Sequence, residues 1–144
     1  NPTVIDLLGQ RFEAVPVCPE VELGMGVPRE PVRLVANDAS SERMVGSESG
    51  KDWTQAMVDF NSIKLEALRQ QNLSGFIFKS RSPSCGPGNV PLHHEQEKSS
   101  TVGLFAHALM QYFPSLPVID EEALQDEIVR QDFVARVIQY GEKV

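Results

Sequence analysis

The chain has 144 residues, of which 41% are hydrophobic and 23% charged, a balance typical of a globular protein with one hydrophobic core. Its formal net charge of −7 argues against a nucleic-acid polymer or an anionic membrane surface as the main partner. No apolar run approaches the roughly 18 residues of a membrane-spanning helix. No signal peptide is recognisable either, so we expect a cytoplasmic protein.

The first third of the chain predicts one helix and two short strands. Apolar residues at helical spacing predict a helix at 3–12. The run "AVPVC" (14–18) is typical of a strand, and Pro16 would make it an edge strand or the start of a strand. A second strand is predicted for "VRLVA" (32–36), whereas "NDASSERMVGSESG" (37–50) is polar enough to form an exposed loop.

The clearest periodicity follows, with one apolar helix face over about 53–71 and Asp52 placed to cap its amino terminus. Later elements are a strand at 76–79, a polar and mobile segment at 86–100, a helix at 101–113, a strand at 116–119 and a last helix at about 126–140. Strands that alternate with helices predict an α/β fold: one layered, Rossmann-like domain over 1–144 with a mainly parallel sheet flanked by helices.

Three motifs with catalytic associations prove weak. "GSESGKD" (46–52) has three residues where a phosphate-binding loop has four, and Asp52 replaces the magnesium-binding hydroxyl. "GMGVPR" (24–29) has Arg29 in place of the third glycine of a dinucleotide fingerprint, and no helix opens after it. His93 and His94 are adjacent in a polar segment, where surface histidines are commoner than metal ligands. None of the three predicts the function.

The two cysteines, Cys18 and Cys85, are more informative. Each follows a predicted strand, and ligands of open α/β sheets bind beyond the carboxyl ends of strands, so we expect the two thiols to converge. A cytosolic disulfide is improbable. Inert cysteines usually lie in apolar cores, whereas "SPSCG" (82–86) surrounds the sulfur with hydroxyls and backbone N–H groups that suit a thiolate or cluster sulfides.

Polar residues near the cysteines each have a functional and an ordinary interpretation. Glu20, two residues beyond Cys18, is either a general acid or base near a metal or an exposed glutamate. Ser82 and Ser84 either donate to a substrate or build the turn. Three cations either hold an anionic substrate group or are simply solvated: Arg29, Lys79 and Arg81.

Four segments are distinctive when they are taken together: "PVCPEVELGMGVPREPVRLV", "KSRSPSCG", "VGLFAHALMQYFPSLPVIDE" and "DFVARVIQYGEK". They resemble the thiouracil desulfidase family of iron–sulfur proteins, formerly catalogued as a domain of unknown function, over about residues 4–141. The resemblance implies a [4Fe–4S] cluster on three cysteines, two of them Cys18 and Cys85. It also implies that the C=S bond of a thiolated uracil base or nucleotide is hydrolysed without net redox, which releases sulfide.

On this resemblance we assign Glu20 as acid and base and Ser82 as a donor to substrate or intermediate, with Ser84 as a weaker candidate. The family's first cysteine and an acidic residue belong to an amino-terminal turn that would precede Asn1. We therefore expect the chain that starts at Asn1 to be cluster-free and inactive. Two alternatives stay open: an accessory module that serves a partner protein, suggested by helix 126–140, and a redox sensor that switches through the two cysteines.

Overall fold

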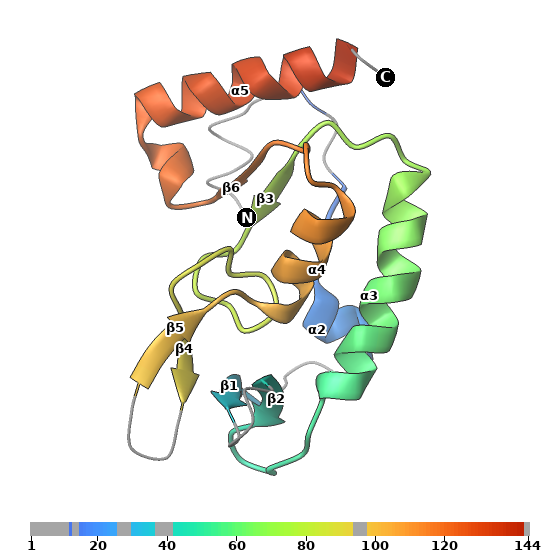
Figure 1. Ribbon diagram of the computed structural model, residues 1–144, viewed down its shortest axis with the longest axis vertical. Coiled ribbons are helices and arrows are strands. Elements are labelled where there is room, and N and C mark those ends of the chain that lie inside the picture. The colour runs from blue at the N-terminus through green and yellow to red at the C-terminus, as the bar shows by residue number, and fades with distance from the viewer. Residues whose placement is uncertain (1–11, 13–14, 26–29, 37–41, 94–97, 143–144) are drawn as a thin grey trace.

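The computed structural model describes residues 12, 15–25, 30–36, 42–93 and 98–142. Figure 1 shows an elongated molecule with α5 across one end and a four-stranded sheet near the other. The elements, in chain order, are α2 (Pro19–Glu22), β1 (Val32–Ala36), β2 (Glu42–Gly46), α3 (Thr54–Arg69), β3 (Phe76–Phe78), β4 (Val90–His93), β5 (Lys98–Thr101), α4 (Leu104–Tyr112), β6 (Val118–Asp120), the 3₁₀ turn η2 (Ala123–Gln125) and α5 (Glu127–Glu142).

The fold is a mixed α/β fold, and the prediction of a mainly parallel, Rossmann-like sheet is not confirmed. The larger sheet has the order β2-β1-β4-β5. In it β1 pairs with β4 in parallel, whereas β1/β2 and β4/β5 are antiparallel. Leu34 lies at the centre of this sheet, opposite Met44 on one side and Leu92 on the other, and all three side chains are buried.

The difference arises from two segments that the sequence analysis assigned to loops. Within 37–50, residues 42–46 form β2, although only Met44 and Gly46 of this strand are buried. Within 86–100, residues 90–93 and 98–101 form β4 and β5. Strands joined by a short connection pair antiparallel, and an edge strand needs few apolar residues because it faces solvent on one side.

A second, two-stranded sheet consists of β3 and β6, which run parallel with Phe76 opposite Val118 and Phe78 opposite Asp120. The strands predicted at 76–79 and 116–119 are thus confirmed, to within a residue or two. Helix α5, predicted at 126–140, packs on this sheet through Phe133 and Val137, which are buried with Ile119 and Leu124. A Cβ atom at Gly75 would lie 2.7 Å from Val137 Cγ2, so this glycine permits the close approach of the helix.

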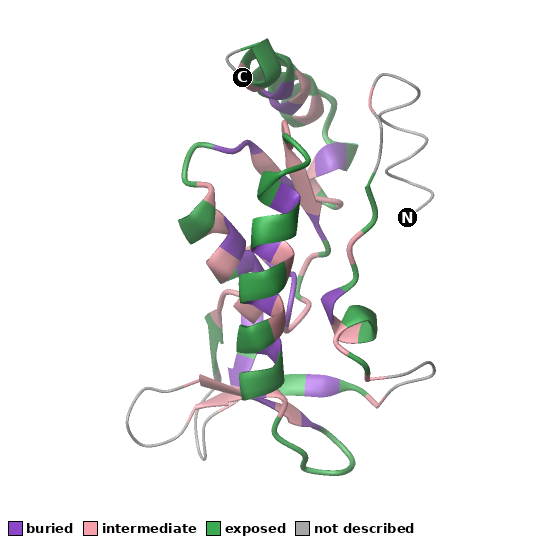
Figure 2. Ribbon diagram, turned by 90° about the vertical axis from the view of Figure 1, so that its right-hand side faces the viewer, coloured by how far each residue is buried: buried purple, intermediate pink, exposed green. Residues whose placement is uncertain are grey.

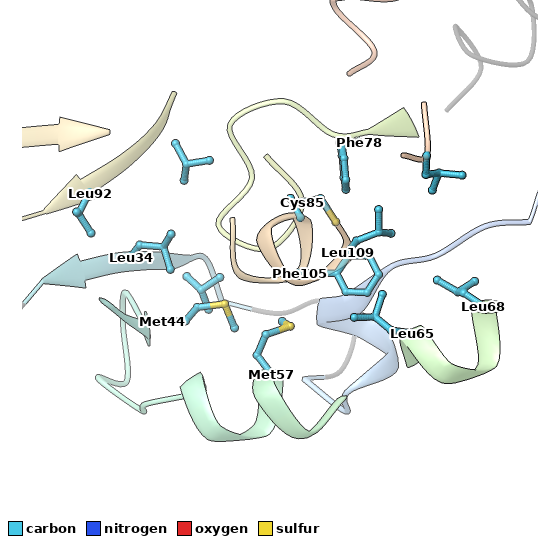
Figure 3. Packing of buried hydrophobic residues seen from close by; sticks show 14 residues of the cluster. Leu34, Met44, Met57, Leu65, Leu68, Phe78, Cys85, Leu92, Phe105 and Leu109 are labelled. Carbon is cyan, nitrogen blue, oxygen red and sulfur yellow. The ribbon is translucent and has the colours of Figure 1, made fainter. Parts of the chain in front are cut away.

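Helices α3 and α4 lie side by side and carry much of the hydrophobic core (Figure 3). Met57, Leu65 and Leu68 of α3 are buried together with Phe105 and Leu109 of α4. The opposite face of α3 is exposed (Figure 2), as its apolar periodicity predicts. The N-cap of α3 is Trp53, so Asp52 lies one residue before the predicted capping position. Its Oδ1 still accepts a hydrogen bond from the Thr54 N–H, at 2.9 Å, and so satisfies one backbone donor at the start of the helix.

The strand predicted near the amino terminus is not confirmed. The strand predicted at 14–18 does not form over 15–18, which are irregular and lead directly into α2. Pro16 and Pro19 lack the N–H group that a strand ladder requires, and Pro19 occupies the first helical turn instead. The helix predicted at 3–12 lies outside the described residues, apart from Phe12. No helix in the described part is both long and apolar enough to span a membrane.

Candidate active site

The loop 79–86, which we call the cysteine loop, connects β3 to the turn before β4 and rests on the amino terminus of α4. The N–H of Leu104 donates to the Pro83 carbonyl at 3.0 Å, and the N–H groups of Phe105 and Ala106 donate to the Ser84 carbonyl at 2.8 and 2.9 Å. The first N–H groups of a helix have no partner within the helix. Here the cysteine loop satisfies them, so the helix end fixes the backbone around Cys85.

Two glycines allow this close contact. Gly103 precedes α4, and its N–H donates to the Gly86 carbonyl at 2.8 Å. A Cβ atom at Gly103 would lie 2.6 Å from the carbonyl carbon and oxygen of Ser84, and one at Gly86 would lie 2.9 Å from the Ser82 oxygen. Both positions therefore require the absence of a side chain.

Short helix α2 presents Cys18 and Glu20 opposite the cysteine loop. Cys18 caps the helix, and its N–H donates to Glu22 Oε2 at 2.8 Å. The other oxygen of Glu22 pairs with Lys64 Nζ of α3 at 2.8 Å. Glu22 thus ties the start of α2 to α3, and the single turn of helix that results presents Glu20 to the loop.

Glu20 and the two serines of the cysteine loop form a hydrogen-bonded chain. Ser84 Oγ donates to Glu20 Oε2 at 2.8 Å, Ser82 Oγ lies 3.1 Å from Ser84 Oγ, and Ser82 Oγ to Glu20 Oε2 is 3.5 Å. Because the single Ser84 proton goes to the carboxylate, Ser82 is the donor in the serine–serine contact. The N–H groups of Ser84 and Cys85 in turn donate to Ser82 Oγ at 3.3 and 3.2 Å.

The two cysteines differ in their surroundings. Cys85 is 9% exposed and lies among Phe78, Phe105 and Leu109 (Figure 3). Burial raises the pKa of its thiol to about 12, and the nearby Glu20 and Cys18 add to the rise. Ser84 Oγ lies 3.7 Å from the Cys85 sulfur. Cys18 is exposed. From the polar surroundings in "SPSCG" we expected Cys85 to lie outside an apolar core. This expectation is wrong, because Cys85 is buried at the edge of the hydrophobic core.

A pocket of about 280 Å³ opens beside this chain of hydroxyls, and Glu20, Lys79, Arg81 and Ser82 line it together with Pro31, Val32, Ser80 and Pro83. Four of the residues selected from the sequence thus share one pocket. Ser84 is buried behind it at 1% exposure. Arg29 lies outside the described residues.

The two described cations of the pocket have different partners. The Arg81 guanidinium forms an ion pair with Glu122 at 2.5 Å. Its charge, which was predicted to bind an anionic group of the substrate, is therefore already paired within the protein. Lys79 is exposed and forms no ion pair with any residue that the structure describes. Of the two, Lys79 is the better placed to meet an anionic group.

Three residues next to the pocket were not predicted from the sequence: Ser80, Glu121 and Glu122. The Ser80 N–H and Oγ both donate to Glu121, at 2.7 and 2.8 Å, and Ser80 Oγ also lies 2.9 Å from Glu122 Oε1. A signal was present, because residues 121 and 122 come two and three positions after the strand predicted at 116–119. However, only the parallel pairing of β3 with β6 shows that the two strand ends meet.

Cys18 and Cys85 supply part of the ligand set that an iron–sulfur cluster needs. Thiolates are the usual ligands of such clusters, and Cys18 lies near enough to Cys85 to influence its pKa. Within the described ranges no group of three or more His, Cys, Asp or Glu side chains is arranged to hold a metal ion. The two thiols therefore fit as part of a cluster's ligand set, and this part of the chain does not complete one.

The fold and site define a class: α/β proteins in which two cysteines, a carboxylate and serines from separate segments meet beside a small pocket. More specifically, the chain belongs to the 2-thiouracil desulfurase family, whose profile matches residues 1–121. This confirms the resemblance found in the sequence.

Two known proteins are similar to the chain. A solved structure described as a [4Fe-4S]-dependent thiouracil desulfidase, TudS, superposes with a TM-score of 0.63 at 26% identity and covers 90% of this chain and 81% of its own. The uncharacterized protein YbbK of Bacillus subtilis (strain 168) is 31% identical over 82 residues, which are 54% of each chain. The matched part thus spans about half the length of that curated relative.

Proposed function

We propose that this protein is an iron–sulfur-dependent desulfidase that hydrolyses the C=S group of a thiolated uracil base or nucleotide. The observation that carries the proposal is the 2.8 Å hydrogen bond from Ser84 to Glu20 on the wall of the pocket, with Cys85 directly after Ser84. A carboxylate, hydroxyl donors and a soft metal ligand are the groups that such a hydrolysis requires. The family and the structural relative support the same reaction class.

Glu20 is the acid and base in this proposal. It lines the pocket, and its Oε2 is held by Ser84 Oγ, so the carboxylate has a fixed orientation toward the pocket. As a base it takes a proton from water that attacks the thiocarbonyl carbon, and as an acid it returns a proton to the departing sulfur. The reaction balances as C=S plus H₂O giving C=O plus H₂S. Positioned groups of this kind contribute about 10²–10⁴-fold to rate.

Ser82 and Ser84 have different roles in the proposed reaction. Ser82 lines the pocket, so its hydroxyl is the one that can turn its proton from Ser84 toward the substrate or toward charge that develops during attack. Ser84 is buried and does not line the pocket, so it acts on Glu20. This arrangement gives Ser84 a larger part than the sequence suggested, as the residue that orients the base.

Cys18 and Cys85 are proposed as two of the thiolate ligands of a [4Fe–4S] cluster. Such a cluster, when it is bound, supplies a Lewis-acidic iron that favours departure of the sulfur. The thiol of Cys85 must lose its proton on ligation, and a bound metal ion provides the driving force for that loss.

The pocket suits a small ring substrate. Its volume of about 280 Å³ lies near the lower end of the range, about 300–1,000 Å³, that is usual for small-molecule sites. Pro31, Val32 and Pro83 give it apolar walls, and Lys79 gives it a positive charge. We propose a thiolated pyrimidine or its nucleotide as substrate, a single domain over 1–144, and action in the cytoplasm without a nucleic-acid polymer or membrane as partner.

The accessory-module alternative loses its main motivation. Helix α5 was suggested as a docking tail, but its buried residues Phe133 and Val137 already pack on the protein's own β3/β6 sheet. The redox-sensor alternative fares no better, because sensing cysteines are exposed thiols of low pKa, whereas burial raises the pKa of Cys85.

Sulfide release tests the proposal. The full-length protein is reconstituted anaerobically with iron and sulfide, desalted and mixed with 2-thiouracil or 4-thiouridine monophosphate in water labelled with heavy oxygen. We expect sulfide and a product that carries the heavy oxygen at the former C=S carbon. A matched sample with Glu127→Gln, an exposed residue of α5, is expected to behave as wild type. No sulfide from any thiolated pyrimidine would refute the proposal.

A further inference from the structure

The cysteine loop has a second anchor, at its amino-terminal end. Glu121 accepts two hydrogen bonds from one residue of the loop: Ser80 N–H to Oε2 at 2.7 Å and Ser80 Oγ to Oε1 at 2.8 Å. Hydrogen bonds to a carboxylate are shorter and stronger than those between neutral groups. Both oxygens of Glu121 are engaged, so its side chain and the start of the loop hold one another in a fixed relation.

The topology explains why these two residues meet. Strands β3 and β6 pair in parallel, so their carboxyl ends lie together (Figure 1). Ser80 follows Phe78 by two residues, and Glu121 follows Asp120 directly. The N–H of Glu121 also donates to the Phe78 carbonyl at 3.2 Å, so the backbone of Glu121 continues the ladder where β3 ends.

The backbone between the two anchors needs such support. Arg81, between Ser80 and Ser82, has φ of +59°, a left-handed conformation that costs free energy for a residue with a side chain. On its far side the Gly86 N–H donates to the Ser82 carbonyl at 2.8 Å. Glu121 on one side and this loop hydrogen bond on the other hold Arg81 in place, and the reversal at Arg81 directs Ser82 and Ser84 toward Glu20.

We propose that Glu121 is a positioning residue, which acts through Ser80 to hold the cysteine loop in the geometry that places Ser82 and Ser84 against Glu20. Its importance for the reaction rests on the proposed function, whereas its hold on the loop does not. Misplacing a reacting group by about 1 Å can cost about 10²-fold in rate, so a residue without contact to substrate can still govern kcat.

Glu122 provides a matched comparison. It is adjacent to Glu121 and contacts the same part of the loop, through Ser80 Oγ at 2.9 Å and through Arg81 at 2.5 Å. However, it accepts no hydrogen bond from the backbone of the described loop, and its ion pair with Arg81 lies between two well-exposed side chains, 62% and 49% exposed, where such pairs contribute little. Glu122→Ala should therefore leave the loop in place where Glu121→Ala does not.

Amide hydrogen exchange of the full-length protein, followed by NMR, tests the hold directly. In Glu121→Ala we expect exchange to accelerate by tenfold or more at Ser80 and also at Ser84, Cys85 and Gly86, which do not touch residue 121. The amides of α3 should keep their wild-type rates, and Glu122→Ala should match wild type throughout. Unchanged rates at Ser84 to Gly86 in Glu121→Ala, or equal acceleration in both variants, would overturn the proposal.

Kinetics of the reconstituted protein test the consequence. We expect Glu121→Ala to lower kcat by about 10–100-fold with KM within about threefold of wild type, Ser80→Ala to have a smaller effect, and the double variant to be no worse than Glu121→Ala alone. Loss of loop protection with unchanged kcat would overturn the positioning role while the desulfidase stands. A wild-type protein without activity would refute the proposed function, and the exchange data alone would then decide whether Glu121 holds the loop.

Discussion

Ser84 Oγ donates a hydrogen bond to Glu20 Oε2 at 2.8 Å, although the two residues are 64 positions apart in the sequence. Each side chain is fixed by its own element: Glu20 by α2, which Glu22 ties to α3, and Ser84 by the amino terminus of α4. The contact therefore joins two separately anchored segments, each of which carries one cysteine. It is the reason to regard Cys18, Glu20, Ser84 and Cys85 as parts of one site.

The role of Glu20 predicts a rate effect without loss of the cluster. Glu20→Gln keeps the size of the side chain and an acceptor for Ser84 but removes the basic carboxylate. We expect sulfide release to fall by about 10²–10⁴-fold, while the absorbance of the reconstituted cluster stays at its wild-type level. Both are measured on one preparation. Full activity in this variant would remove Glu20 from the mechanism.

Ser84 should matter through Glu20 and not through packing. In Ser84→Ala the Glu20 carboxylate loses the donor that lies at 2.8 Å, so we expect kcat to fall by at least about tenfold and the free energy of unfolding by about 1 kcal/mol. Urea denaturation and steady-state kinetics measure the two quantities. Ser62→Ala, on the exposed face of α3, is the control and should change neither. A kcat equal to wild type in Ser84→Ala would show that Glu20 needs no such orientation.

Packing of the cysteine loop on α4 predicts a strong asymmetry between two glycines. A Cβ atom at Gly103 would lie 2.6 Å from the Ser84 carbonyl, whereas one at Gly88 would meet nothing within 4 Å. We expect Gly103→Ala to destabilise the protein by about 1–3 kcal/mol, the usual cost of overpacking, and to lower activity as the loop shifts. Gly88→Ala should unfold at the wild-type temperature in a thermal melt. Equal melting temperatures for the two variants would contradict the observed contact.

The sequence selected residues that the structure brings together, whereas it did not predict the order of the sheet, and both outcomes have physical reasons. Four residues could be selected from the sequence because a soft ligand seldom lies so close to a carboxylate or hydroxyls, and because the family motifs contain them: Cys18, Glu20, Ser82 and Cys85. The sheet order could not be read in the same way. β2 and β5 are polar edge strands whose alternation is weak, so their residues look like loop residues.

The ion-pair partners of individual charged side chains could not be predicted from the sequence either. Arg81 and Lys79 look equivalent in the sequence, and only the folded chain shows that Glu122 takes Arg81 while Lys79 has no ion-pair partner among the described residues. The same holds for Glu121, whose link to Ser80 depends on the parallel pairing of two strands 42 residues apart. Helix α3, by contrast, is a local feature and was predicted correctly. Asp52, predicted as its cap, lies one residue before the N-cap and accepts a backbone hydrogen bond from Thr54.

Asp52 predicts a pH dependence of stability. The hydrogen bond from Thr54, with Arg43 at 2.9 Å as a further partner, lowers the pKa of Asp52 below its ordinary value of 3.8. A carboxyl whose pKa is lower in the folded state stabilises the protein above its unfolded pKa and loses that contribution as the pH falls through its folded pKa. The stability difference between wild type and Asp52→Ala should therefore be largest near pH 7 and shrink below about pH 4. Urea denaturation at several pH values measures it, and a difference that grows toward acid would contradict the assignment.

The most direct test of the shared site is to replace each cysteine in the full-length protein, as Cys18→Ser and Cys85→Ser, and to reconstitute both variants beside wild type. Visible absorbance, bound iron and sulfide release from 2-thiouracil are then measured on the same samples. The account predicts that each substitution removes cluster absorbance and sulfide release together, because in the proposed function both thiols are ligands of one cluster beside Glu20. A variant that keeps a full complement of iron and wild-type sulfide release would show that its cysteine is no ligand and that the site lies elsewhere.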